Sequence, residues 1–273
     1  MATYIFNAMY GRVVTEIDAF GDFSLFCFRT VRWMGTSLFH LRDFRLLLPQ
    51  FHDVGAKSVP IVSITGLFVG MVIAVQAAAQ FLSLGLGGYL GPVINLSVTR
   101  ELGPVLAGLM LAGRVGGAMT AELGTMHVTE QIDALATMGV DPVRYLVVPR
   151  FLACMLLTPI LTIYADFLGV IGGYLISVDI YGVSATLYWR YTAQSLENWD
   201  IFSGLFKSIL FGGAIALIAC YKGFNSRAGA EGVGRACTDA FVASFVSILT
   251  IDFFMAVFLN SLYKVLWGGK SLI

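Results

Sequence analysis

The longest uncharged stretch of the chain most limits the folds available to it. No Asp, Glu, Lys or Arg occurs from Ser58 to Thr99, a run of 42 residues. A helix needs about 20 mostly apolar residues to cross a bilayer, so this run predicts one membrane span and a shorter element. The whole chain is 58% hydrophobic and 12% charged, whereas soluble domains average about 25% charged residues. We therefore predict an integral membrane protein.

Further apolar runs bring the predicted number of spans to five. We expect all of them to be helices, because an open sheet edge cannot face lipid. The predicted spans cover residues 58–82, 101–122, 151–178, 203–221 and 240–263. Leu82–Pro92 is rich in glycine and is predicted to form a turn or a re-entrant piece. The predicted fold class is an all-α integral membrane protein.

Basic residues are concentrated in three regions that an odd number of spans places on one side of the membrane. Six precede the first span, two lie in residues 123–150 and three lie in residues 222–237. Loops rich in Lys and Arg usually face the cytoplasm. We therefore expect a cytoplasmic N-terminus and an external C-terminus. The formal net charge is zero, so no basic field indicates a nucleic-acid partner.

Residues 1–50 are predicted to form an interfacial amphipathic region. Within them, residues 23–50 combine bulky apolar side chains with recurring arginines, as in an elbow helix that lies in the cytoplasmic leaflet. A sixth span is disfavoured because charged residues interrupt the apolar length. They are Arg29, Arg32, Arg42, Asp43 and Arg45.

A short amphipathic helix is predicted between the second and third spans. Thr129 and Glu130 suit its start, since acids favour the first turn of a helix. Gly139 suits a left-handed C-cap, and Pro142 prevents continuation. About ten residues cannot cross a bilayer. The helix is either an ordinary connector or a coupling helix that fits a groove on a cytoplasmic motor.

Several charged residues lie in or near the predicted spans, where charge is costly and often functional. Arg100 and Glu101 form either a polar spot for a lipid head group or partner chain, or an ion pair that sets the helix end. Arg114 is expected to snorkel or to pair with Glu122 or another buried acid. Three further acids would permit a proton relay, although structural pairing is favoured: Asp166, Asp239 and Asp252.

Glycine spacing predicts close helix contacts in the first two spans. Gly66 and Gly70 form one small-xxx-small pair, and Gly113 and Gly117 form another. The first span reads either as a packing helix or as the wall of an apolar cavity. Such a wall beside Arg100 would suit an amphiphile with two tails and a charged head.

No catalytic motif is present in the sequence. HExxH and GxSxG do not occur, and the four cysteines form no CxxC pair. The C-terminal Gly269-Lys270-Ser271 resembles the end of a phosphate-binding loop, but Lys264 occupies the position of its first glycine. We therefore predict no enzyme activity, no metal site and no cofactor in this chain.

The segment TRELGPVLAGLMLAGRVGGAMTAELGTMHVTEQIDALATMGVDPVRYLVVPR resembles the signature of the MlaE/YrbE family. These proteins are permease subunits of ABC transporters that move phospholipids or other lipids between bacterial membranes. The resemblance extends over about residues 50–262 and includes GLFVGMVIAVQ (66–76), YKGFNSRAGAEGVGR and Asp252. It implies an MlaE-type permease domain over residues 51–273.

The resemblance also implies partners and site residues. It implies a homodimer in the bacterial inner membrane, cytoplasmic ATPase subunits that bind the ATP, and a periplasmic MCE-domain protein. The implied function is phospholipid transport that maintains outer-membrane lipid asymmetry. The implied lipid-binding residues are Phe68, Val72, Val75, Ala79, Arg100, Glu101, Leu102 and Val105. The implied ATPase-coupling residues are Glu130, Gln131, Ile132, Asp133, Leu135, Met138 and Gly139.

Two functions of other classes stay open. A proton-coupled secondary transporter would use Asp166, Asp239 or Asp252 and would need no ATP. A membrane anchor would recruit soluble partners, move nothing and hold no lipid. Neither function requires a short capped helix between two spans, so the sequence favours the ABC permease.

Overall fold

The computed structural model describes residues 2–37 and 44–267, and within these ranges every regular element is a helix. Five helical stretches are long and apolar enough to cross a membrane: Leu46–Ser83, Gly87–Val128, Val143–Ile180, Asn198–Phe224 and Ala230–Leu266. The predicted fold class and its five spans are confirmed. Each span is longer than predicted.

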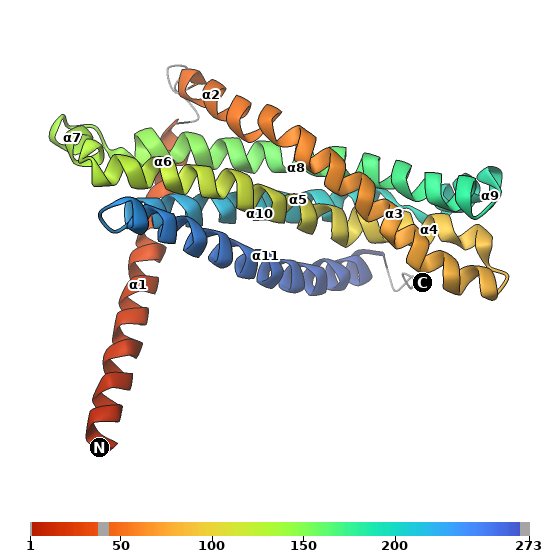
Figure 1. Cartoon of the computed structure of the whole chain (residues 1–273), viewed down its shortest axis with the longest axis horizontal. Coiled ribbons are helices and arrows are strands. Elements are labelled where there is room, and N and C mark those ends of the chain that lie inside the picture. The colour runs from red at the N-terminus through yellow and green to blue at the C-terminus, as the bar shows by residue number, and fades with distance from the viewer. Residues whose placement is uncertain (1, 38–43, 268–273) are drawn as a thin grey trace.

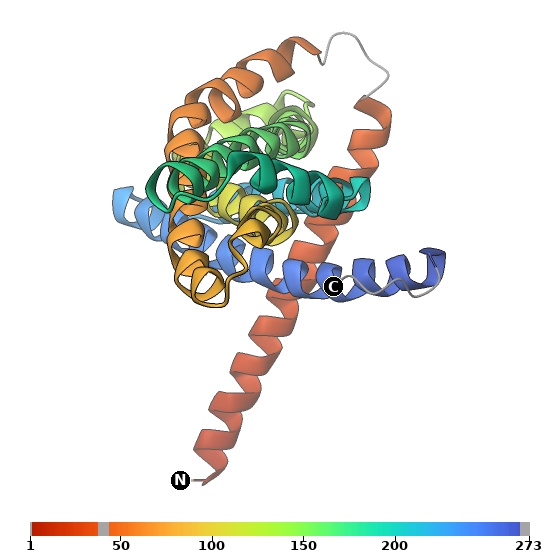
Figure 2. The same ribbon diagram turned by 90° about the vertical axis from the view of Figure 1, so that its right-hand side faces the viewer.

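The five spans lie side by side, and the short elements gather at their two ends (Figure 1, Figure 2). The α-helices are α1 (Ala2–Ser37), α2 (Phe44–Val54), α3 (Val59–Ser83), α4 (Leu90–Ser97), α5 (Gly103–Leu111), α6 (Gly117–Val128), α7 (Gln131–Thr137), α8 (Val148–Tyr174), α9 (Ala185–Ser195), α10 (Asn198–Phe224) and α11 (Ala230–Trp267). In Figure 1, α2 and α7 lie at the left end of the bundle, whereas α9 and the α3–α4 turn lie at the right end.

The N-terminal region differs in part from the predicted elbow helix. α1 runs across the spans at a steep angle, as a helix on the membrane surface would (Figure 1). α2 belongs instead to the first span, which begins at Leu46. The predicted helix over residues 23–50 therefore divides between the end of α1 and α2. Arg42 and Asp43 lie outside the described residues.

The second span begins much earlier than predicted, at Gly87 instead of residue 101. The predicted turn is confined to the residues around Gly85, which has a φ of +70°. Pro92 lies in the first turn of α4, where its missing N–H costs nothing. Farther along, Gly103 N–H donates to Val98 O because Pro104 interrupts the α-helical bonds, and this makes one π-helical turn.

Close packing between α3 and α8 depends on glycine. A Cβ atom on Gly70 would lie 1.8 Å from the carbonyl oxygen of Gly169, and one on Gly66 would lie 2.6 Å from that of Ala165. The packing interpretation of these two glycines is confirmed. The second predicted pair is wrong, since a Cβ on Gly117 would have nothing within 4 Å.

α10 lies at the centre of the bundle and packs against α5, α6, α8 and α11. Its side chains Phe211, Ile215, Ala216 and Ala219 are fully buried or nearly so. Small residues allow the close approach, because a Cβ on Gly212 would lie 2.5 Å from the carbonyl oxygen of Cys154. The central place of α10 brings its polar residues against the second and fifth spans.

Candidate functional site

Arg100 and Glu101 lie in the π-helical turn of the second span, and each pairs with a residue of α10. Arg100 Nη2 is 2.5 Å from Asp200 Oδ1, and the Asp200 side chain is completely buried. Lys207 Nζ is 2.6 Å from Glu101 Oε2. Of the two alternatives for Arg100 and Glu101, an ion pair between them is not formed, because each pairs with α10 instead.

Lys207 joins three helices at this end of the bundle. Its side chain is only 2% exposed, and its ammonium group also lies 3.0 Å from Asp252 Oδ1 in α11. A cation removed from water needs such partners, because burial alone would be very costly. Sequence reasoning missed Asp200 and Lys207. The available signal was a single lysine within an otherwise apolar span.

A small hollow of about 50 Å³ opens beside these charges. Arg100, Glu101 and Lys207 contribute its charged side, and Ala256 and Leu259 of α11 contribute an apolar side. The charged ends are thus partly accessible, and the Glu101 side chain is 46% exposed. A polar head group could contact this hollow while its tails stay in apolar surroundings.

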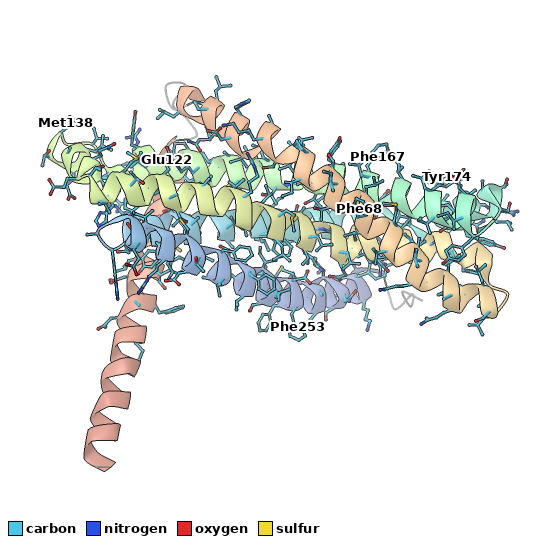
Figure 3. The ribbon with its side chains drawn as sticks, in the orientation of Figure 1. Phe68, Glu122, Met138, Phe167, Tyr174 and Phe253 are labelled. Carbon is cyan, nitrogen blue, oxygen red and sulfur yellow. The ribbon has the colours of Figure 1, made fainter. Side chains whose placement is uncertain are left out.

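The predicted lipid wall on α3 is an exposed stripe in the single chain. Phe68 is 58% exposed, and Val72 and Val75 are about half exposed on the same helix face. Ala79 continues the stripe by helical spacing. Figure 3 labels Phe68 on this helix. The stripe lies on the side of α3 that does not pack against α8.

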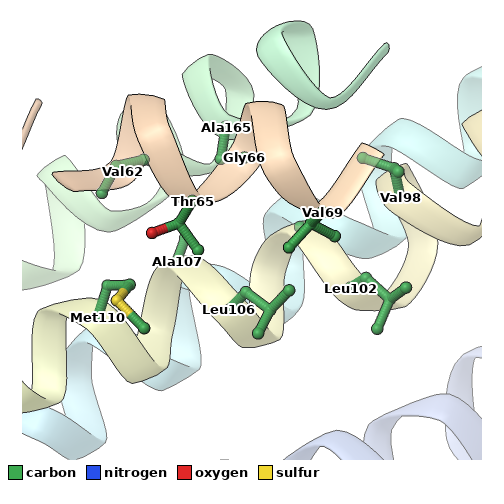
Figure 4. A pocket seen from close by; sticks show the side chains of 11 residues that line it. Val62, Thr65, Gly66, Val69, Val98, Leu102, Leu106, Ala107, Met110 and Ala165 are labelled. Carbon is green, nitrogen blue, oxygen red and sulfur yellow. The ribbon is translucent and has the colours of Figure 1, made fainter. Parts of the chain in front are cut away.

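The crevice between α3 and α5 contains little of the predicted lipid wall (Figure 4). Of the predicted lipid-binding residues, Leu102 lines it together with Val62, Val69, Leu106 and Met110. Its volume is about 10 Å³, which does not admit an acyl chain. Val105 is half-buried nearby on α5. The predicted residues thus occupy separate places in the single chain: the stripe on α3, the crevice that Leu102 lines, and the hollow that Arg100 and Glu101 line.

α7 is shorter than predicted and begins differently. It has seven residues, and Glu130 precedes it in a left-handed conformation with φ of +59°. Glu130 makes no side-chain capping hydrogen bond, and Thr129 Oγ1 accepts a hydrogen bond from the side chain of Gln131 over 3.0 Å. At the other end, Gly139 has the predicted left-handed conformation, with φ of +78°. Val140 N–H donates to Leu135 O over 3.1 Å, which closes the C-terminus.

The predicted coupling residues divide between two faces of α7. Ile132 is 7% exposed and packs with Leu123 and Val147, and Leu135 is half-buried against the same cluster. Met138 is 69% exposed at the end of the bundle (Figure 3). The remaining coupling residues are also exposed: Glu130, Gln131, Asp133 and Gly139. Ile132 and Leu135 therefore anchor α7 to the bundle, whereas the exposed residues are the ones available to a partner.

Asp141 ties α1 to the segment after α7. Its carboxylate accepts hydrogen bonds from Arg29 at 2.8 Å, from Trp33 Nε1 at 2.9 Å and from the Val143 backbone at 2.9 Å. Burial of the carboxyl group opposes ionisation, but these donors outweigh it and lower the pKa of Asp141. Arg144 also lies 5.2 Å from the centre of the Trp33 ring. Sequence reasoning missed this junction.

The other charges of the spans find partners that were not predicted. Glu122 pairs with the buried Arg150 over 2.8 Å, so the expected pair between Arg114 and Glu122 is wrong. Arg114 donates instead to Asp53 O and to Ser58 Oγ. Among the described residues, no hydrogen bond or ion pair joins any two of Asp166, Asp239 and Asp252. A continuous relay of these three acids is therefore not favoured.

Similarity to known proteins identifies the family of the chain. The family described as Permease MlaE matches residues 47–258, which is most of the chain. A probable ABC transporter permease protein of Rickettsia felis is 42% identical over 253 residues, covering 93% of this chain and 96% of the relative.

Two further relatives have more descriptive names. The intermembrane phospholipid transport system permease protein MlaE of Haemophilus influenzae is 35% identical over 252 residues, covering 89% of this chain and 97% of the relative. The chloroplastic protein TRIGALACTOSYLDIACYLGLYCEROL 1 of Arabidopsis thaliana is 40% identical over 214 residues, covering 78% of this chain and 61% of the relative. With its five spans and this extent of similarity, the chain belongs to the MlaE permease family of ABC transporters.

Proposed function

We propose that the chain moves phospholipid between the bacterial inner membrane and a periplasmic MCE-domain protein, and that this transport maintains outer-membrane lipid asymmetry. The chain acts as a homodimer. Separate cytoplasmic ATPase subunits bind and hydrolyse the ATP, so the permease itself needs no cofactor. Its N-terminus faces the cytoplasm and its C-terminus faces the periplasm.

The exposed face of α7 is the observation that carries this proposal. Ile132 anchors the helix to the bundle, while Met138 projects from its end. α7 joins the end of the second span to the start of the third, and its C-terminus is closed by Gly139. A short helix held in this way transmits force to both spans, whereas a flexible connector would absorb it.

The apolar stripe of α3 supports a lipid as cargo and a second copy of the chain as partner. Phe68, Val72 and Val75 offer an apolar wall. Arg100, already paired with Asp200, lines the hollow in which a polar head group would compete for the charged side chains. The stripe is open in the single chain, so a second copy facing it would complete a cavity for two acyl tails. Glu101, Leu102 and Val105 complete the proposed binding surface together with Ala79.

The proposed mechanism follows from these two surfaces. ATP binding closes the motor subunits, and the movement enters through residues 130–139. α6 and the start of the third span then shift together, because Ile132 of α7 packs with Leu123 of α6 and with Val147, which directly precedes α8. The shift narrows the cavity between the two copies and drives the lipid toward or from the periplasmic partner.

Met138→Asp in the assembled transporter tests the coupling step. We expect lipid-coupled ATP hydrolysis to fall by about tenfold, since an apolar contact residue is replaced by a charge. Leu84→Asp is the matched control, because Leu84 is 70% exposed at the opposite end of the bundle. Full activity of Met138→Asp would refute the coupling assignment. Lipid transport driven by a proton gradient without ATP would instead favour the secondary transporter.

A further inference from the structure

A cavity of about 230 Å³ with charged residues in its lining lies between the start of the first span and the second span, on the side that carries α7. Asp53, Lys57, Arg114 and Glu122 supply its charged groups. Val115 and Met119 of the second span are among its apolar lining residues. This cavity is separate from the hollow beside Arg100. The 14 helical residues from Arg100 to Arg114 correspond to roughly 21 Å.

The charges of this cavity do not cancel once their partners are counted. Lys57 pairs with Asp53 at 2.5 Å, and Glu122 pairs with Arg150 at 2.8 Å. Arg114 makes no ion pair with a carboxylate among the described residues. Arg150 does not line the cavity, but it neutralises Glu122 from α8. Arg114 is therefore the one lining cation that has no carboxylate partner among the described residues.

Two hydrogen bonds hold the guanidinium group of Arg114 in place, but they use only one of its three nitrogen atoms. Its Nη1 atom donates to Asp53 O over 3.1 Å and to Ser58 Oγ over 2.6 Å. Its Nη2 and Nε atoms have no hydrogen-bond partner among the described residues, although the side chain lines the cavity. A planar group with two adjacent free donors matches the oxygen atoms of a phosphate.

Arg114 is bonded to the point of the first span at which the charged sequence ends and the uncharged run begins. It bonds to Ser58, the first residue of the 42-residue uncharged run, and to the backbone of Asp53 in the charged segment before it. This junction marks the boundary between head groups and hydrocarbon. Ile61 and Ile64 are exposed just beyond it on α3, where acyl tails would run.

We propose that this cavity binds the phosphate of a glycerophospholipid from the leaflet on the α7 side, with Arg114 as the main ligand. Lys57 lies at the rim and adds a second positive charge. The choice of a phospholipid, and not free phosphate, rests on the proposed function. The phosphate chemistry itself rests on Arg114 and its surroundings.

The test is native mass spectrometry of the purified full-length chain during titration with phosphatidylglycerol, diacylglycerol or inorganic phosphate. We expect Arg114→Gln to weaken phosphatidylglycerol binding by about tenfold, as expected for loss of a charge-assisted contact. Diacylglycerol has the tails without the phosphate, so its binding should not change. Arg235→Gln is the matched control, because Arg235 is exposed on the same side and pairs with Glu231.

Three results would overturn the site. They are unchanged phosphatidylglycerol binding in Arg114→Gln, an equal loss in Arg235→Gln, or inorganic phosphate binding as tightly as the lipid. If Arg114→Gln does not fold, Arg114→Lys and Lys57→Gln replace it, and each should weaken phosphatidylglycerol binding selectively. Lipid-coupled ATP hydrolysis tests the proposed function separately, because binding by the isolated chain requires no ATPase.

Discussion

The ammonium group of Lys207 in α10 lies 2.6 Å from the carboxylate of Glu101 in the second span. This contact joins two helices that are about 100 residues apart in sequence. Glu101 therefore pairs with Lys207 and not with its neighbour Arg100, which is bonded to Asp200. The charges at the predicted lipid mouth are therefore fixed by α10, and a head group would compete with these partners.

Removal of Lys207 should destabilise the bundle strongly. Lys207→Met leaves Glu101 and Asp252 without their shared cation, and loss of one member of a buried ion pair costs about 3 kcal/mol. Thermal unfolding of the purified protein measures this loss. The triple change with Glu101→Gln and Asp252→Asn should recover most of the stability, because the stranded charges are then gone. A triple variant no more stable than Lys207→Met would contradict the assignment.

Two glycine substitutions should have opposite effects. Gly70→Ala forces α3 and α8 apart, since the new Cβ would overlap the carbonyl oxygen of Gly169. Gly117→Ala meets nothing within 4 Å, and alanine favours a helix by about 0.5–1 kcal/mol over glycine. We expect a lower melting temperature for the first variant and an equal or higher one for the second. The same decrease in both would show that helix contact is not the cause.

The junction between α1 and Asp141 should depend on pH. The pKa of Asp141 is lowered in the folded protein, so its contribution is present above the ordinary carboxyl pKa of about 4. It is lost as the pH falls below that value, when the carboxylate is protonated. Limited proteolysis of α1 should therefore accelerate in this acidic range.

A matched pair of variants isolates the carboxylate responsible. Asp141→Asn should release α1 already at neutral pH and should remove the acid-dependent step. Asp133→Asn changes an exposed carboxylate on α7, and proteolysis of its α1 should depend on pH as in the unmodified protein. If the acid-dependent step persists in Asp141→Asn, another group controls the attachment of α1.

Local chemistry explains why much of the fold was predictable. Hydropathy over about 20 residues identifies a span without any knowledge of its neighbours, and all five were found. The left-handed Gly139 was also predictable, because a C-cap depends on the few residues around it. The start of the second span was missed, since a glycine-rich segment can continue as a helix when other helices pack against it.

The sequence by itself established the five spans, the short helix between the second and third, and the family resemblance. These features depend on composition and on neighbouring residues. The partners of Arg100, Glu122 and Asp141 became known only from the tertiary structure, because each lies on another helix. Ion pairs between separate helices leave no periodic trace in a sequence, unlike i,i+4 pairs within one helix such as Asp53–Lys57. The same holds for Arg114: that no described carboxylate pairs with it is visible only when the carboxylates around it are seen with their own partners.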